Sequence, residues 1–152
     1  MMKQYLKLLG ILTISIMLAS LTGCRAKSVT EAEISWLFDR WNSAIQTGDP
    51  AKVVALYAAD SVLLPTLSNK PRLTPAEKEE YFVHFLKDRP SAKIDFRRIY
   101  VGPDMAVDSG LYTFTFARTG EVVSGRYSFV YRRTASGWRI VSHHSSLTPK
   151  AN

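Results

Sequence analysis

Two hydrophobic periods divide the chain, a helical period in its first half and a two-residue period in its second. Apolar side chains at helical spacing come first: Ile34, Leu37, Phe38, Trp41 and Ile45. This spacing is typical of a helix with one buried face. Thr30 and Glu33 form a capping box before it and Gly48 follows it, so the pattern predicts a helix between them.

Two further helices are predicted before the period changes. Asp49-Pro50 starts a short one, because Asp caps free N–H groups and Pro is tolerated at the first helical position. A brief strand-like run at 61–65 and an irregular loop at 66–72 come next. A second capping box at 74–77 then starts a third helix that runs to about residue 87.

From residue 92 onward apolar and polar residues alternate, which predicts β-strands. We expect four strands, at about 93–101, 105–117, 121–133 and 138–146. The connections between them are short, as antiparallel hairpins require. The fold class is therefore α+β, with three N-terminal helices packed on a curved antiparallel sheet, and one domain covers residues 30–149.

Hairpin geometry predicts which side chains share a face of the sheet. A three-residue loop with Gly120 in the left-handed conformation pairs Ala117 with Glu121, and a four-residue loop pairs Arg133 with Trp138. One face then carries Asp108, Tyr112, Phe114, Phe116, Arg126, Ser128, Val130, Val141, His143 and Ser145. The other face carries Tyr127, Phe129, Tyr131, Trp138, Ile140, Ser142 and His144.

The first face predicts a small-molecule pocket, because polar groups gather there over an apolar floor. Arg126 would bind an anion such as a carboxylate, and Tyr112, Ser128, His143 and Ser145 would orient it.

An alternative is an isomerase, cyclase or dehydratase. Asp108, His143 or His144 would act as its base, and Tyr112 would steady a developing oxyanion. A third possibility is a structural envelope module without a ligand. In that case each of these groups only packs, or pairs with a neighbour.

The aromatic second face would form a large exposed patch if left in water, so it predicts a homodimer or a higher homo-oligomer through the sheet. The chain has no Ser-His-Asp elbow, Gly-rich phosphate loop or dinucleotide fingerprint. Its single cysteine excludes an internal disulfide and a multi-cysteine metal site. We therefore expect no metal, no cofactor and no nucleic-acid partner.

The N-terminus has the layout of a lipoprotein signal. Lys3 and Lys7 precede an apolar stretch that ends in Leu21-Thr22-Gly23-Cys24, and this stretch is short for a membrane span. The ending resembles a bacterial lipobox, so residues 1–23 are predicted as a signal peptide, Cys24 as the lipidation site and 24–29 as a tether. Multiple acyl chains on Cys24 would anchor the protein to the bilayer.

Composition fits an exported, folded domain. The 152 residues include 46% hydrophobic residues and 20 Lys or Arg against 13 Asp or Glu, and removal of residues 1–23 leaves 18 basic residues against the same 13 acidic ones. These values exclude a disordered tail and a multi-pass membrane protein. By resemblance to Gram-negative sorting, Arg25 favours the outer membrane, facing the periplasm.

Motifs along 31–149 resemble the nuclear-transport-factor-2-like cone of ketosteroid isomerases and polyketide cyclases. They are closer to the association domain of calcium/calmodulin-dependent protein kinase type II and its small bacterial relatives. The matching motifs are Trp41-Asn42, Gly48-Asp49-Pro50, Leu56-Tyr57-Ala58, Asp60 to Pro65, Tyr81-Phe82, Asp108 to Tyr112, Arg126-Tyr127, Val130 to Arg133, Gly137-Trp138, His143 to Ser146 and Pro149.

The resemblance implies the cone fold and self-association. The kinase domain has a deep pocket lined by arginines, whereas the matching positions here are Tyr112, Ser128 and Ser145. Arg126, one pair away, could supply the charge. The chain has no kinase motif, so we expect no kinase activity of its own.

Overall fold

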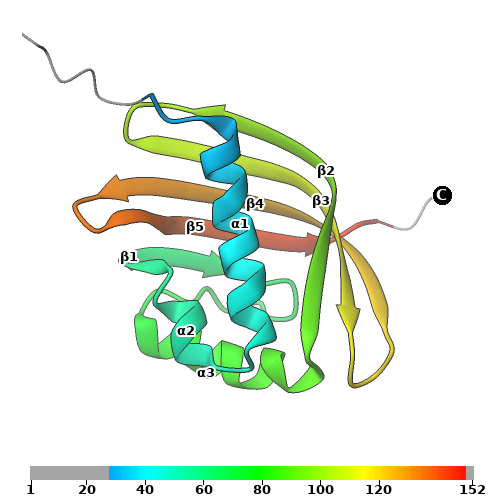
Figure 1. Ribbon diagram of the computed structural model, residues 1–152. Coiled ribbons are helices and arrows are strands. Elements are labelled where there is room, and N and C mark those ends of the chain that lie inside the picture. The colour runs from blue at the N-terminus through cyan, green and yellow to red at the C-terminus, as the bar shows by residue number, and fades with distance from the viewer. Residues whose placement is uncertain (1–27, 150–152) are drawn as a thin grey trace, which may run out of the picture.

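The computed structural model describes residues 28–149 as three α-helices, one 3₁₀ turn and five strands (Figure 1). The helical elements are α1 (Glu31–Gln46), α2 (Pro50–Val54), α3 (Pro75–Phe85) and η1 (Leu86–Asp88). The strands are β1 (Tyr57–Leu64), β2 (Pro90–Val101), β3 (Met105–Phe116), β4 (Val122–Thr134) and β5 (Gly137–Leu147). The signal peptide and Cys24 lie outside the described residues.

The predicted caps start the helices. The Thr30 hydroxyl accepts from the Glu33 N–H at 3.2 Å, and the Asp49 carboxylate accepts from the Ala51 N–H at 3.0 Å. At α3 both bonds of the capping box form, so Thr74 and Glu77 satisfy each other's free N–H groups. The three predicted helices and the α+β fold class are confirmed.

The sheet has the order β1-β5-β4-β3-β2 and is strongly curved (Figure 1). β1 pairs with β5 in parallel, and the other neighbours are antiparallel. The sequence predicted only a brief strand-like run at the place of β1, so its parallel pairing is an addition to the expected antiparallel sheet. Helix α1 lies across the concave face, while α2 and α3 close one end of the cone.

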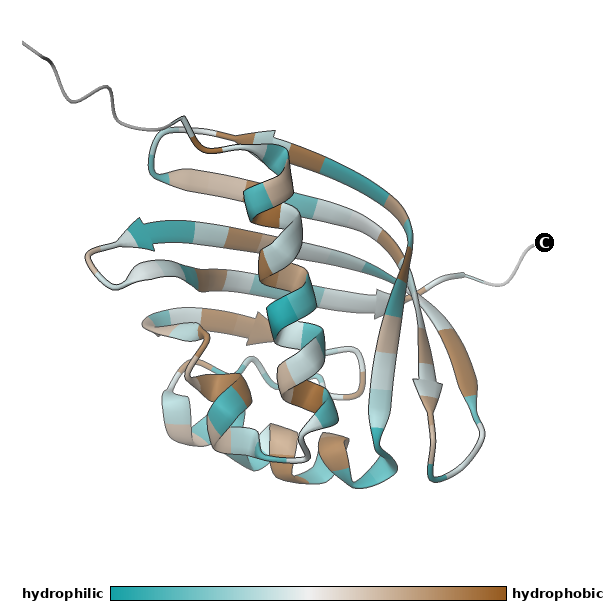
Figure 2. Ribbon diagram, viewed as in Figure 1, coloured by the Kyte–Doolittle hydropathy of each residue, from teal (hydrophilic) through white to brown (hydrophobic). Residues whose placement is uncertain are grey.

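The core lies between α1 and the concave face of the sheet. Helix α1 buries Ile34, Leu37, Phe38, Trp41 and Ile45, the five residues of its predicted face. The ribbon coloured by hydropathy shows brown and teal segments alternating along α1 (Figure 2). The sheet side of this core is aromatic and includes Tyr112, Phe114, Tyr127, Phe129, Tyr131 and Trp138.

The predicted pairing of β3 with β4 is wrong by one residue. Gly120 does adopt the left-handed conformation, with φ of 74°. However, the loop has four residues and closes on Phe116 and Glu121, whose backbone hydrogen bond measures 2.9 Å. Tyr112 therefore faces Gly125 instead of Arg126. A one-residue slip exchanges the two faces of a strand, so Arg126 and Ser128 lie on the convex face.

The β4–β5 hairpin closes as predicted, with Arg133 opposite Trp138. Further along, a β-bulge changes the register: Tyr131 pairs with Ile140, whereas Val130 pairs with Ser142. The extra residue in β5 is Val141. Such a residue reverses the in-out alternation of its strand. Trp138 and Ile140 therefore lie on the same concave side as His143, and the prediction that separated them is wrong.

These two shifts also overturn the role predicted for the aromatic stripe. Tyr127, Phe129, Tyr131, Trp138 and Ile140 are buried under the helices and form no exposed interface. The convex face instead carries the alternate residues, including Arg126, Ser128 and the exposed His144. Among the described residues, none of the helices is long and apolar enough to span a membrane.

Candidate functional site

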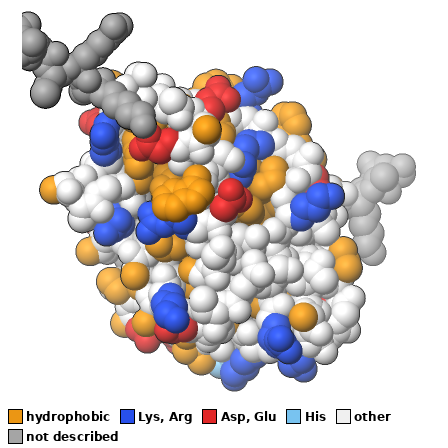
Figure 3. All heavy atoms as spheres, viewed as in Figure 1, with side chains coloured by type: hydrophobic (Ala, Val, Ile, Leu, Met, Phe, Trp, Pro, Cys, Tyr) orange, Lys and Arg blue, Asp and Glu red, His pale blue; other side chains and the backbone are white. Residues whose placement is uncertain are grey.

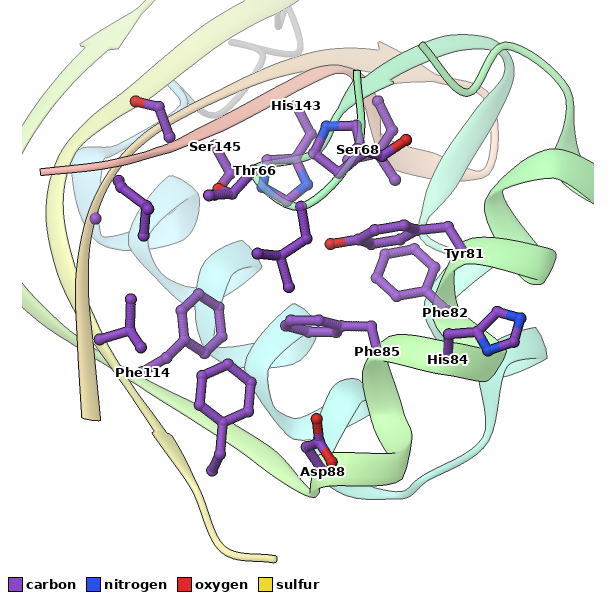
Figure 4. A pocket seen from close by; sticks show the side chains of 18 of the residues that line it. Thr66, Ser68, Tyr81, Phe82, His84, Phe85, Asp88, Phe114, His143 and Ser145 are labelled. Carbon is purple, nitrogen blue, oxygen red and sulfur yellow. The ribbon is translucent and has the colours of Figure 1, made fainter. Parts of the chain in front are cut away.

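A pocket of about 470 Å³ opens at the end of the cone where α3 faces the sheet (Figure 4). It lies between α3, the loop from Pro65 to Arg72 and the concave sides of β3, β4 and β5. Its apolar lining comprises Trp41, Leu63, Pro65, Leu67, Tyr81, Phe82, Phe85, Tyr112, Phe114, Phe116, Val123 and Leu147. Its polar lining includes Thr66, Ser68, Arg72, Asp88, Glu121, His143, Ser145 and Ser146.

The walls are aromatic on two opposite sides. Tyr81 and Phe85 come from one side of α3, and their rings stack with centroids 5.7 Å apart. Phe114 and Phe116 face them from β3, and Phe85 meets Phe114 edge to face at 5.6 Å. Figure 4 shows Tyr81 and Phe85 extending toward the sheet. Such walls suit a flat apolar ligand.

A chain of three hydroxyls forms the polar end. The Tyr112 hydroxyl bonds to Ser145 Oγ, which in turn bonds to Thr66 Oγ1 at 2.6 Å. Tyr112 can lie flat here because Gly125 is opposite: a Cβ at Gly125 would come within 2.7 Å of the Tyr112 ring. Burial raises the pKa of Tyr112 to about 12, so its phenol is neutral.

His143 lines the same polar end beside Thr66 and Ser145 (Figure 4). Its Nδ1 lies 2.7 Å from the Tyr57 hydroxyl, which also accepts from Trp41 Nε1 at 3.1 Å. The imidazole stacks on Phe129 with centroids 4.0 Å apart. Burial among these rings lowers the pKa of His143 to about 3, so the ring is neutral at physiological pH.

Arg72 supplies a cationic group to the pocket lining. It is held in place because its backbone exchanges two hydrogen bonds with Leu63 of β1, at 2.9 and 3.0 Å. Its side chain is 13% exposed, bonds to Glu80 at 3.1 Å and lies over the Tyr81 ring. The buried Arg72 Nε has no hydrogen-bond partner among the described residues. This donor is therefore free for a ligand or a water molecule.

Carboxylates line the opposite end. Asp88 lies far from His143 in Figure 4 and accepts a hydrogen bond from the Arg118 guanidinium. Glu121 is exposed. His84 belongs to the lining, but its ring points away from the cavity. The carboxylates of the lining therefore lie at the end opposite His143, and the hydroxyls and the imidazole lie at the other.

Asp108 lies on the concave face but outside the pocket lining. It is fully buried, and its Oδ1 accepts from Arg97 Nε at 3.1 Å and from the Tyr127 hydroxyl at 2.9 Å. Burial raises its pKa, and the Arg97 guanidinium opposes this rise. Arg97 also bonds to Ser35 of α1. The arrangement ties helix α1 to the sheet and leaves Asp108 no contact with the pocket.

Three of the predicted pocket residues come together, namely Tyr112, His143 and Ser145. Arg126, Ser128 and His144 do not, because they lie on the convex face. Thr66 and Arg72 were not predicted as pocket residues, because they lie in an irregular loop where no periodicity marks the inward side. Their one available signal was the capping box after the loop, which fixes where the loop must end.

The site combines several kinds of chemical group. It offers aromatic walls, one guanidinium, a neutral imidazole and hydroxyls that can donate or accept. An imidazole with so low a pKa is a weak base, and Asp108 is paired outside the pocket lining, so neither of these two predicted bases is poised to abstract a proton. No cluster of His, Cys, Asp and Glu within 28–149 is placed to bind a metal ion.

Sequence and structure comparisons identify similar proteins. The profile of the calcium/calmodulin dependent protein kinase II association domain family matches residues 30–149. A solved protein from Xanthomonas campestris, assigned by name to the same association domain, is 44% identical, with a TM-score of 0.76. The match covers 81% of this chain and 91% of that one. No curated protein matches the sequence.

More distant solved structures share the fold alone. An NTF2-like protein of unknown function from Pseudomonas putida is 18% identical with a TM-score of 0.70, over 80% of this chain and 89% of that one. A ketosteroid isomerase-like protein from Erwinia carotovora is 20% identical with a TM-score of 0.62, over 78% and 96%. These likenesses confirm the predicted cone.

Proposed function

Because the chain belongs to the calcium/calmodulin-dependent protein kinase II association domain family, we propose that it is an exported, lipid-anchored domain that self-associates and binds a small anionic molecule with an apolar body. The observation that carries the binding function is the pocket of about 470 Å³ with aromatic walls and a donor-rich end. Its volume and composition fit small-molecule sites.

Arg72 supports an anionic ligand. Its Nε is buried without a partner, and a guanidinium N–H in such a place gains most from a negatively charged oxygen. Arg126, the arginine expected at this role, is exposed on the convex face. The two arginines therefore form a matched pair for a test, since they differ in position and not in chemistry.

Titration calorimetry with benzoate, phenylacetate and 1-naphthoate tests the proposal. We expect at least one of these aromatic carboxylates to bind the full chain. Arg72→Leu should weaken its affinity about tenfold or more, because a hydrogen bond to a charged group is lost. Arg126→Leu should leave the affinity unchanged. Absence of binding by all three probes, or equal losses in both variants, would refute the assignment.

Self-association through the convex face of the sheet is the second part of the proposal. This face exposes Phe96, Tyr100, Met105, Leu111 and Val122, each at least 39% exposed. Phe96 and Leu111 are direct cross-strand partners, so their side chains form one apolar surface with Arg126 next to them. The association-domain family supports an oligomer.

Native mass spectrometry of the full chain measures this oligomer. Leu111→Glu should shift the population to monomer, because it places a charge in the centre of the proposed interface. Trp36→Glu is the matched control, since Trp36 is an exposed residue of α1 on the other side of the molecule. A monomeric wild-type protein, or an oligomer indifferent to Leu111→Glu, would rule out this interface.

Export and lipid anchoring rest on the sequence of the N-terminus. Expression in a bacterial host should give a protein that begins at Cys24 with acyl chains attached and that sediments with the envelope. Cys24→Ala should abolish the attachment of acyl chains and the cleavage before residue 24. A mature N-terminus elsewhere in the chain would remove this part of the proposal and leave the pocket unaffected.

A further inference from the structure

A hydrogen-bonded relay lies behind the polar end of the pocket. It runs from Trp41 of α1 through Tyr57 of β1 to His143 of β5, three elements that meet only in the folded protein. The Trp41 Nε1 to Tyr57 Oη distance is 3.1 Å and the Tyr57 Oη to His143 Nδ1 distance is 2.7 Å. All three side chains are buried, with at most 6% exposed.

The direction of each bond follows from the groups present. The indole N–H of Trp41 can only donate, so the Tyr57 oxygen accepts from it. The Tyr57 proton then needs an acceptor, and His143 Nδ1 is the one within reach. If Nδ1 carried a proton instead, the Tyr57 proton would be buried without a partner, which is costly. His143 Nδ1 is therefore the acceptor.

A neutral imidazole with Nδ1 as acceptor carries its proton on Nε2. Tyr57 stays protonated because burial raises its pKa, and burial keeps His143 neutral. His143 Nε2 is buried and has no hydrogen-bond partner among the described residues. The relay thus ends in an unsatisfied donor on a ring that lines the pocket.

We propose that Trp41 and Tyr57 lock His143 in the Nε2–H tautomer, and that this N–H donates to an acceptor oxygen of the pocket ligand. The inference rests on the proposed binding function and specifies its ligand class: an aryl carboxylate with a carboxylate oxygen at this end of the pocket. Trp41 and Tyr57 are positioning residues, and His143 is the residue that contacts the ligand.

A second unpartnered donor supports this ligand class. Arg72 lines the same pocket, and its Nε, like His143 Nε2, is buried without a hydrogen-bond partner among the described residues. Two fixed hydrogen-bond donors favour a ligand group that only accepts hydrogen bonds. An ammonium group at this end would instead meet a guanidinium charge and an N–H, so amines are selected against.

Long-range ¹⁵N–¹H NMR of the ring nitrogens tests the tautomer directly. The chain has three histidines, so His84→Gln and His144→Gln variants assign the spectrum. We expect His143 Nε2 to give the signal of a protonated nitrogen and Nδ1 that of an unprotonated one. Benzoate should shift the Nε2–H proton signal on binding, whereas benzylamine should leave it in place.

Tyr57→Phe removes the proton that occupies Nδ1. The His143 ring should then exchange between its two tautomers, and benzoate affinity should fall in proportion to the fraction that no longer presents Nε2–H, which is about twofold for an even mixture. Tyr131→Phe is the control: it also removes a buried phenol hydroxyl, but that hydroxyl has no partner among the described residues and lies outside the pocket lining. Tyr131→Phe should leave His143 in a single tautomer and leave the affinity for benzoate unchanged.

The outcomes separate the two proposals. A protonated Nδ1 in the wild-type protein would overturn the tautomer lock, even if benzoate binds. Binding of benzoate with no response at Nε2 would overturn the ligand contact and leave the pocket function standing. Failure of benzoate, phenylacetate and 1-naphthoate to bind, with the Nε2–H signal present, would overturn the pocket function and the ligand contact together.

Discussion

Replacement of Lys78 by methionine should destabilise the protein more than any surface substitution in α3. The Lys78 side chain is fully buried, which is rare for lysine, and its Nζ donates to Ser61 O at 2.7 Å and to Leu73 O at 2.9 Å. These carbonyls belong to β1 and to the segment just before α3. Lys78 therefore holds both ends of the loop from Pro65 to Arg72, the pocket loop, against helix α3.

The magnitude follows from these two bonds. A hydrogen bond from a charged donor contributes about 1.5–3 kcal/mol, and methionine fills a similar space without donating. The two carbonyls would remain buried without their partner, while the added apolar packing offsets part of the loss. Burial lowers the pKa of Lys78, which shows that its charge is held at some cost. We expect Lys78→Met to lose roughly 2–4 kcal/mol of unfolding free energy.

Urea denaturation followed by tryptophan fluorescence measures the loss, which corresponds to a melting temperature lower by roughly 10 °C. Lys87→Met is the matched control, because Lys87 is exposed in η1 and should change stability by less than about 0.5 kcal/mol. The pocket loop should also loosen, so benzoate affinity should fall in Lys78→Met alone. Equal stability of the two variants would show that the buried ammonium contributes nothing.

Three other predictions concern the sheet. Burial lowers the pKa of His143 to about 3, so the stability that its neutral ring contributes is present above pH 6.5 and is lost as pH falls toward 3. Relative to His143→Gln, the wild type should therefore lose about 2 kcal/mol of unfolding free energy between pH 7.5 and pH 5 in urea titrations. Gly125→Ala should cost roughly 1–3 kcal/mol by the same assay, since the new Cβ would displace the Tyr112 ring. Arg97→Met should cost roughly 3 kcal/mol by leaving Asp108 buried and unpaired, and the double variant with Asp108→Leu should regain much of this loss in a double-mutant cycle.

The element pattern could be predicted from the sequence because each boundary has a local chemical cause. Thr30, Asp49 and Thr74 cap helices through their own side chains, and these bonds form within three residues of the cap. The β1 strand was harder to predict, because its partner β5 is about 80 residues away in the chain and pairs with it in parallel. No local pattern encodes such a pairing.

The register of the sheet depended on single residues that the sequence leaves ambiguous. Loops of three and of four residues can both end in a left-handed glycine, and Gly120 fits either. Val141, the bulged residue, is β-branched and looks like an ordinary strand residue. Each error changed the face of a strand. The predicted pocket therefore contains Arg126, whereas the observed pocket contains Arg72.

A physical criterion was nevertheless available to choose the register. Helix α1 presents five buried apolar side chains, and a sheet face must cover them. Tyr127 and Phe129 lie in the one stripe of the sheet that is large and apolar enough, and both contact the Phe38 ring, with centroids 5.9 and 6.0 Å apart. Any register that turns this stripe outward leaves α1 packed on Arg126 and Ser128, which would bury a charge without a partner. The apolar face of α1 requires an apolar face of the sheet, and this requirement alone predicts Tyr127 inside and Arg126 outside. The same comparison would have required the extra residue in β5, because Trp138 and His143 cannot both face α1 in a regular strand.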